Sequence, residues 1–184
     1  MELVARYELG VRTIVVIPWQ EEWPDEFAKI QRELDEVLSD TVISIEHVGS
    51  TSVEGLAAKP IIDIDIVIEE SKFEAVKERL ASIGYIHNGD QGVPKREAFN
   101  YTGKDHLMKH HLYVCPKDSP ELHRHLALRD CLRQNPVLRD KYSNIKLEMA
   151  KKHPHDIDAY IDGKGDVVRE IYRVWEEQKC GYHS

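Results

Sequence analysis

The stretch "IIDIDIVI", residues 61–68, constrains the fold more than any other part of the chain. Its isoleucines alternate with Asp63 and Asp65 in the two-residue period of a β-strand. The predicted strand therefore turns isoleucines to one face of a sheet and two carboxylates to the other. Because burying unpaired carboxylates costs several kcal/mol, we expect a ligand or a charged partner beside them.

Periodicity and turn residues predict the remaining elements. Predicted strands cover 11–17, 42–48, 61–68, 85–88, 96–102 and 110–115. Predicted helices cover 24–38, 71–83, 120–134, 136–152 and a last segment around 167–175, with a short helical turn over 51–57. A capping box of Ser71 and Glu74 is expected to begin the second helix. This order predicts an α+β fold, with one domain over 1–184 that consists of an α/β core (about 1–116) and a helical C-terminal part (about 117–184).

Composition limits the classes of partner. The formal net charge of -8 argues against a surface that binds nucleic acid or an anionic membrane. The three cysteines, Cys115, Cys131 and Cys180, are widely spaced and are expected to be reduced thiols. The first ten residues carry charges and no apolar core, so no signal peptide is expected. These features predict a cytoplasmic protein.

The aspartate strand follows a short turn that contains Gly49 and Ser50. Glycine lets a phosphate approach the backbone closely, and free amides at a helix start attract anions. Asp63 and Asp65, about 7 Å apart on one strand face, are suited to Mg²⁺ or Mn²⁺, because hard cations prefer oxygen ligands and share their shell with substrate phosphates. The combination predicts a site for a nucleoside triphosphate with its metal.

These residues carry a family resemblance. The segment "EHVGSTSVEGLAAKPIIDIDIVI", residues 46–68, closely resembles the corresponding stretch of the GrpB family, a branch of the nucleotidyltransferase fold superfamily. Similar stretches are "PWQEEWPDEF" at 18–27, "HHLYV" at 110–114 and the sequences of the C-terminal helices. The resemblance implies a nucleotidyltransferase-like mixed sheet flanked by helices, with a helical C-terminal third and a metal–nucleotide site.

The resemblance also assigns roles to single residues. It implies that Asp63 and Asp65 hold the metal. Phosphate contacts are implied for Gly49, Ser50 and Thr51, and for the basic residues Lys59, Arg96, Arg129, Lys146 and Lys164. The third carboxylate that is usual in the superfamily is not evident. The candidates to complete the site are His111, as a ligand or general base, and Glu97.

Two further pairs of histidines have a spacing that invites a metal interpretation. His123 and His125 lie two residues apart on a predicted helix, where they do not share a face. His153 and His155 flank Pro154 in a turn. Both pairs are therefore interpreted as surface histidines.

Three functions fit these residues. The first is a metal-dependent nucleotidyltransferase that acts on a nucleoside triphosphate and a small-molecule acceptor. The second is a non-catalytic module that binds a nucleotide or phosphometabolite, which the missing third carboxylate favours. The third is a phosphohydrolase that uses the same carboxylates. Pyrophosphate release, binding without release, and orthophosphate release distinguish them.

Overall fold

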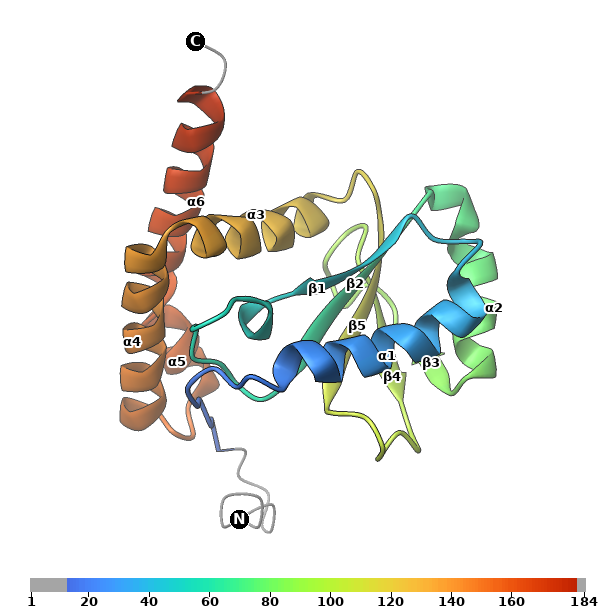
Figure 1. Cartoon of the computed structure of the whole chain (residues 1–184), viewed down its shortest axis with the longest axis horizontal. Helices are drawn as coiled ribbons and strands as arrows, with labels where there is room; N and C mark the ends of the chain where they lie inside the picture. The colour runs from blue at the N-terminus through green and yellow to red at the C-terminus, as the bar shows by residue number, and fades with distance from the viewer. Residues whose placement is uncertain (1–12, 182–184) are drawn as a thin grey trace.

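A computed structural model describes residues 13–181, and its centre is a five-stranded mixed sheet (Figure 1). The strands are β1 (Ser44–Val48), β2 (Ile62–Ile68), β3 (Tyr85–His87), β4 (Glu97–Tyr101) and β5 (His110–Pro116). Their spatial order is β1-β2-β5-β4-β3. The β2–β5 pair is parallel and the other pairs are antiparallel. The aspartate strand β2 thus lies inside the sheet, with β1 and β5 as neighbours.

Helices flank this sheet, and two 3₁₀ turns follow β1 and β2. The helices are α1 (Trp23–Leu38), α2 (Phe73–Ser82), α3 (Pro120–Gln134), α4 (Pro136–Lys152), α5 (Ile157–Asp162) and α6 (Gly165–Gly181); the 3₁₀ turns are η1 (Ser50–Ser52) and η2 (Glu70–Lys72). In Figure 1, α1 and α2 lie beside the sheet, and α4, α5 and α6 gather at the opposite end of the molecule from α2. The α+β class and the helical C-terminal third are confirmed.

The isoleucine face of β2 forms the main core. Ile62, Ile64, Ile66 and Ile68 are all fully buried, as the alternation predicted. They share one cluster with apolar side chains of α1 and α2, among them Ile30, Leu34, Leu38, Val76 and Leu80. Burial of one such side chain stabilises a fold by about 1.5–3 kcal/mol. This packing fixes the strand face, and therefore the direction of both aspartates.

A second apolar cluster attaches the helical third to the loop between β1 and β2. Val53 and Leu56 of that loop are fully buried against residues of α3, α4 and α6. The hydroxyl of Ser143 on α4 also accepts a hydrogen bond from the Ala57 amide at 2.8 Å. The C-terminal helices are therefore held beside the turn that follows β1.

Two sequence predictions need correction, and one helix was missed. Residues 13–17 form no strand; Ile17 makes a single bridge to Ala58, and residues 11 and 12 lie outside the described part. The capping box of Ser71 and Glu74 does not form, because η2 occupies that segment and Lys72 precedes the helix without a side-chain cap. The short helix α5 was not predicted; six residues are too few for a periodic signal.

Candidate functional site

The turn after β1 brings a glycine against the first aspartate. Gly49 has a φ of 69°, a conformation that favours glycine. A Cβ added there would overlap the Oδ2 atom of Asp63 and lie 2.9 Å from its Cβ. Gly49 therefore allows η1, which begins at Ser50, to lie directly beside the Asp63 carboxylate.

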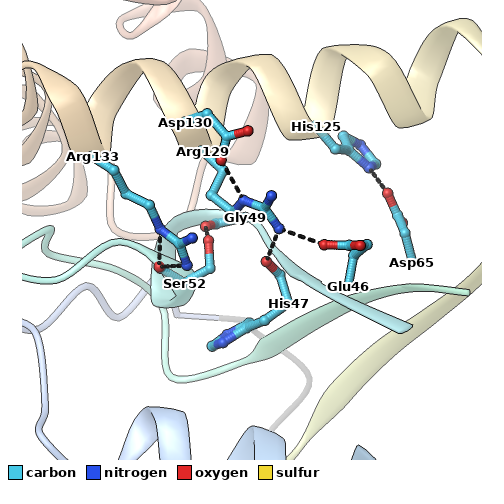
Figure 2. Close-up of polar contacts among 9 residues, drawn as sticks. All are labelled: Glu46, His47, Gly49, Ser52, Asp65, His125, Arg129, Asp130 and Arg133. Carbon is cyan, nitrogen blue, oxygen red and sulfur yellow. Dashed lines mark hydrogen bonds and ion pairs between the residues drawn. The ribbon is translucent and has the colours of Figure 1, made fainter. Parts of the chain in front are cut away.

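The two aspartates share a strand face but differ in exposure. The Asp63 side chain is 32% exposed, and its Oδ1 atom lies 2.9 Å from Nδ1 of His111, its neighbour in register on β5. The Asp65 side chain is fully buried, and its Oδ2 atom lies 2.7 Å from Nδ1 of His125 on α3 (Figure 2). The other oxygen of Asp65, Oδ1, is buried without a hydrogen-bond partner.

Burial controls the charge of the Asp65–His125 pair. Burial raises the pKa of Asp65, and the contact with His125 opposes this shift without cancelling it. Burial lowers the pKa of His125, but the hydrogen bond and charge of Asp65 outweigh burial, so the net shift is upward. Both groups therefore hold their protons more tightly than usual.

A cavity of about 220 Å³ opens beside Asp63 and is rich in lysine. Its ionisable lining consists of Lys59, Lys146, Lys164, Asp63 and His111. Ser50 and Thr51 of η1 also line it. We call this the lysine cavity. The residues that line it come from the turn after β1, the loop before β2, α4, and the segment between α5 and α6.

The lysines of this cavity lie beside aromatic rings. Lys146 is 2% exposed; its Nζ atom has no hydrogen-bond partner and lies 4.5 Å from the centre of the Tyr142 ring. Lys59 and Lys164 approach the Tyr160 ring at 5.1 and 4.4 Å. A buried ammonium without an anionic partner is costly.

Burial shifts the titration of all three lysines in the same direction. It lowers the pKa of Lys146 to about 6, assisted by the nearby Lys164 charge. It lowers the pKa of Lys164 to about 8. The pKa of Lys59 is lowered as well, although the Asp63 carboxylate opposes the effect of burial. An anion in the lysine cavity would reverse these shifts, because an opposite charge favours the protonated form.

A second cavity, of about 160 Å³, also borders Asp63. Its polar lining includes Arg96, Tyr113 and His125, and Gly49 forms part of its wall. We call this the arginine cavity. Asp63 is common to both cavities, so two ligands could approach the same carboxylate.

Three predicted site residues line neither cavity: the fully buried Asp65, and Glu97 and Arg129. Glu97 pairs in register with Val114, which belongs to the isoleucine-face cluster, and its carboxylate lies 2.6 Å from Nε2 of His87. Arg129 donates to Oε2 of Glu46 at 2.8 Å and to the His47 carbonyl at 3.2 Å (Figure 2). Glu97 is therefore separated from the aspartates by the sheet, and Arg129 holds α3 against β1.

The interpretation of His125 as a surface residue is wrong. His125, Arg129 and Arg133 recur every four residues on α3 and point toward the sheet and η1 (Figure 2). Arg133 donates to the Ser52 carbonyl at 2.7 Å. The four-residue spacing of these basic residues was a signal in the sequence, whereas His123 is exposed as predicted.

Glu46 was also missed as a neighbour of the aspartates. It lies opposite Asp65 in the β1–β2 register, so both side chains share one sheet face. Its carboxylate forms an ion pair with Arg129 (Figure 2). Glu46 is thus close to the site but already neutralised.

The aspartates fit a divalent cation that shares its shell with a ligand. Among residues 13–181, no group of three His, Cys, Asp or Glu side chains could hold a metal ion by itself. Asp65 nevertheless has a buried oxygen without a partner, and the His111 contact uses only one oxygen of Asp63. Two carboxylates completed by substrate phosphates are a common arrangement for Mg²⁺.

The described helices include none that is long and apolar enough to span a bilayer.

Comparisons with known proteins agree with this fold. The family model described as "GrpB protein" matches residues 13–174. "UPF0157 protein YqkA" of Bacillus subtilis is 34% identical over 176 residues, which are 94% of this chain and 50% of that protein. This chain therefore spans half the length of that relative. A crystal structure of the conserved protein GrpB from Enterococcus faecalis has a TM-score of 0.77 at 32% identity, covering 90% of this chain and 99% of that one.

The fold is also similar to that of Cid1. The structure of Cid1 in complex with its short product ApU has a TM-score of 0.52 at 14% identity, covering 73% of this chain and 43% of that one. Another structure, described as the Cid1 poly(U) polymerase with MgGTP bound, has a TM-score of 0.50 at 11% identity, covering 72% of this chain and 43% of that one. At these identities the similarity is one of fold, namely the nucleotidyltransferase-like sheet with flanking helices.

Proposed function

This chain belongs to the GrpB family, and from that premise we propose that it is a Mg²⁺-dependent nucleotidyltransferase. It would transfer a nucleotidyl group from a nucleoside triphosphate to a small-molecule acceptor. Mn²⁺ could replace Mg²⁺, since both prefer oxygen ligands. The MgGTP complex of Cid1, a protein of similar fold, supports this choice of donor and cation.

The observation that carries the proposal is the position of the lysine cavity. Three lysines with lowered pKa values meet at Asp63, in a chain with a net charge of -8. A triphosphate would supply the anionic charge that these lysines lack. Ser50 and Thr51 of η1 would add hydroxyl and amide donors on the other wall of the cavity.

Asp63, which lines this cavity, and Asp65, which is buried beside it on the same strand face, would hold the cation. When bound, the cation would neutralise charge that develops on the leaving pyrophosphate. His111 would orient Asp63 through their 2.9 Å contact, and His125 would orient Asp65 through theirs of 2.7 Å. The lysines would fix the triphosphate, so that positioning and electrostatics do most of the catalytic work.

The chain's overall charge supports a small acceptor rather than a polynucleotide. A net charge of -8 repels a phosphate backbone, whereas a local cluster of lysines suffices for one triphosphate. The helical C-terminal part, which contributes Lys146 and Lys164, would act with the sheet as a single domain. Cys115 and Cys131 are free and buried, which supports a cytoplasmic location.

A binding module without turnover is the second candidate. The observation in its favour concerns Glu46, the further carboxylate on the sheet face of Asp63 and Asp65. Because Glu46 is bound by Arg129, it does not serve as the third carboxylate of a catalytic site. Such a module would hold the nucleotide in the lysine cavity and act through a partner.

Metal-dependent pyrophosphate release distinguishes the candidates. The purified chain is incubated with each nucleoside triphosphate, Mg²⁺ and a panel of small acceptors, and pyrophosphate and orthophosphate are measured separately. The transferase releases pyrophosphate, and the Asp63→Asn, Asp65→Asn variant does not. Nucleotide binding with no release supports the module, and orthophosphate release alone supports a phosphohydrolase.

A further inference from the structure

The arginine cavity contains a cation with a buried N–H group that has no hydrogen-bond partner. Its volume is about 160 Å³, whereas one water molecule needs roughly 10–15 Å³ of cavity volume. The cavity can therefore hold a functional group larger than a solvent molecule. It shares Asp63 with the lysine cavity, and Gly49 belongs to its lining alone.

Arg96 is the cation in question. Its guanidinium carbon lies 4.4 Å from the centre of the Tyr113 ring, and its Nε atom is buried without a hydrogen-bond partner. Among residues 13–181, the other arginines bind a carboxylate, a carbonyl or a tyrosine hydroxyl, as Arg129 and Arg133 do. Arginine presents a planar fork of donors that matches carboxylates and phosphates. A free guanidinium stacked on a ring in a cavity is thus prepared for such an oxyanion.

The other ionisable groups that line this cavity are already engaged. Asp63 contacts His111 and would hold the cation, and His125 contacts Asp65 through Nδ1 and Glu121 through Nε2. Tyr113 stands opposite Asp65 in the β2–β5 register, and its ring lies against the Arg96 guanidinium. Glu46 is bound by Arg129, and His111 contacts Asp63 in the lysine cavity. An acceptor hydroxyl would have to lose a proton during attack, whereas a carboxylate or phosphate oxygen is already anionic at neutral pH.

We propose that the arginine cavity is the acceptor subsite, and that the acceptor attacks through an anionic oxygen, of a carboxylate or a phosphate, held by Arg96. The proposal rests on the proposed transferase function and specifies the chemical class of the acceptor. Asp63 separates the two ligands, with the triphosphate in the lysine cavity and the acceptor in the arginine cavity.

The reaction balances without a base. A bond forms between the acceptor oxygen and the α-phosphorus of the triphosphate, and the bond from that phosphorus to the α–β bridging oxygen breaks. Pyrophosphate leaves with the electron pair. The acceptor gives up no proton, and the product is a phosphoanhydride from a phosphate or a mixed acyl anhydride from a carboxylate.

Oxyanion binding is tested first, without nucleotide. Thermal unfolding is followed against inorganic phosphate and, separately, acetate, with chloride at equal ionic strength as the reference. A background variant, Lys146→Met with Lys164→Met, removes charge from the lysine cavity. In this background we expect saturable stabilisation by at least one of the two anions, and about a tenfold or greater rise in its apparent Kd on adding Arg96→Gln. Lys95→Gln, which removes the neighbouring exposed charge, should leave that Kd unchanged.

The acceptor class is tested next, with nucleoside triphosphate and Mg²⁺. Phosphate monoesters, carboxylates and uncharged polyols are compared for their stimulation of pyrophosphate release. We expect stimulation by an oxyanion class and a raised KM for it in Arg96→Gln, with the nucleotide-dependent thermal shift retained. Treatment of the product with hydroxylamine shows whether the acceptor oxygen came from a carboxylate or a phosphate, because hydroxylamine converts a mixed acyl anhydride to a hydroxamate and leaves a phosphoanhydride intact.

The outcomes separate the two proposals. Stimulation by uncharged polyols alone, or oxyanion binding that is indifferent to Arg96→Gln, overturns the acceptor assignment and leaves the transferase function standing. Arg96-dependent oxyanion binding without any pyrophosphate release supports the subsite and contradicts the transferase function.

Discussion

Replacement of Lys146 by methionine should stabilise the ligand-free protein, by an amount that depends on pH. Burial lowers the pKa of this lysine from 10.5 to about 6. Since the folded-state pKa lies below the unfolded value, the unfolded chain binds an extra proton between these limits. The stability of the wild type therefore falls as the pH falls through this window, by about 1.4 kcal/mol per pH unit for this one group.

The magnitude follows from the width of that window. At pH 7 the cost of keeping Lys146 in its folded environment is of order 5 kcal/mol, which is an upper value because local relaxation reduces it. Methionine has a similar length and no charge, so the variant escapes this cost. The difference in unfolding free energy between variant and wild type should shrink by about 2.7 kcal/mol from pH 7 to pH 9.

Urea unfolding at pH 7, 8 and 9 measures this difference. Lys151→Met, on the same helix but exposed, serves as the control and should change stability by less than about 0.5 kcal/mol throughout. A pH-independent difference for Lys146→Met would refute the reasoning. A loss of several kcal/mol at pH 7 would do the same, because it would mean that the ammonium is paired within the fold.

Two further substitutions test the geometry of the site. Gly49→Ala should lower the free energy of unfolding in urea by about 1–3 kcal/mol, because the new Cβ overlaps the Asp63 carboxylate at a positive φ. The control, Gly92→Ala, also has a positive φ, of 79°, but its Cβ meets no neighbour within 4 Å, so it should cost less. Equal losses would contradict this account. His125→Ala should cost about 1–3 kcal/mol by removing the partner of a buried carboxylate, and His123→Ala less than about 0.5 kcal/mol; an innocuous His125→Ala would show that the pair contributes nothing.

Local patterns predicted much of the fold. The alternation in residues 61–68 sets the strand and its faces by side-chain geometry alone, and the structure buries all four isoleucines. The N-cap at Ser119, which accepts from the Leu122 amide, and the boundary at Asn135 and Pro136 follow from equally local rules. These features do not depend on distant parts of the chain.

The errors arose where distant residues decide the outcome. Residues 13–17 have the β-branched density of a strand, but the Ile14 amide bonds to the Pro154 carbonyl, and this contact with the helical third replaces a sheet partner. The contact of His125 joins residues sixty positions apart. Spacing within one helix could show that His123 and His125 face different ways, but it could not show which of them meets Asp65.

The candidate site was partly accessible for the same reason. The turn at Gly49 and the pair of aspartates are local motifs, and the structure places Gly49 against Asp63. The lysine cavity assembles from segments before β2, on α4 and before α6, so only the family resemblance pointed to Lys146 and Lys164. The cost of burying these ammonium groups becomes visible only when the packing is known.

Thermal unfolding with nucleoside triphosphates, with and without Mg²⁺, tests the central claim most directly. A nucleotide at a hundred times its Kd should stabilise the protein by about 2.7 kcal/mol. The account predicts a Mg²⁺-dependent shift for at least one nucleotide. This shift should be lost in the double variant Asp63→Asn with Asp65→Asn. It should be kept in the double variant Asp105→Asn with Asp158→Asn, which changes the net charge equally at exposed positions. No shift with any nucleotide, or a shift that survives in the Asp63 and Asp65 variant, would contradict it.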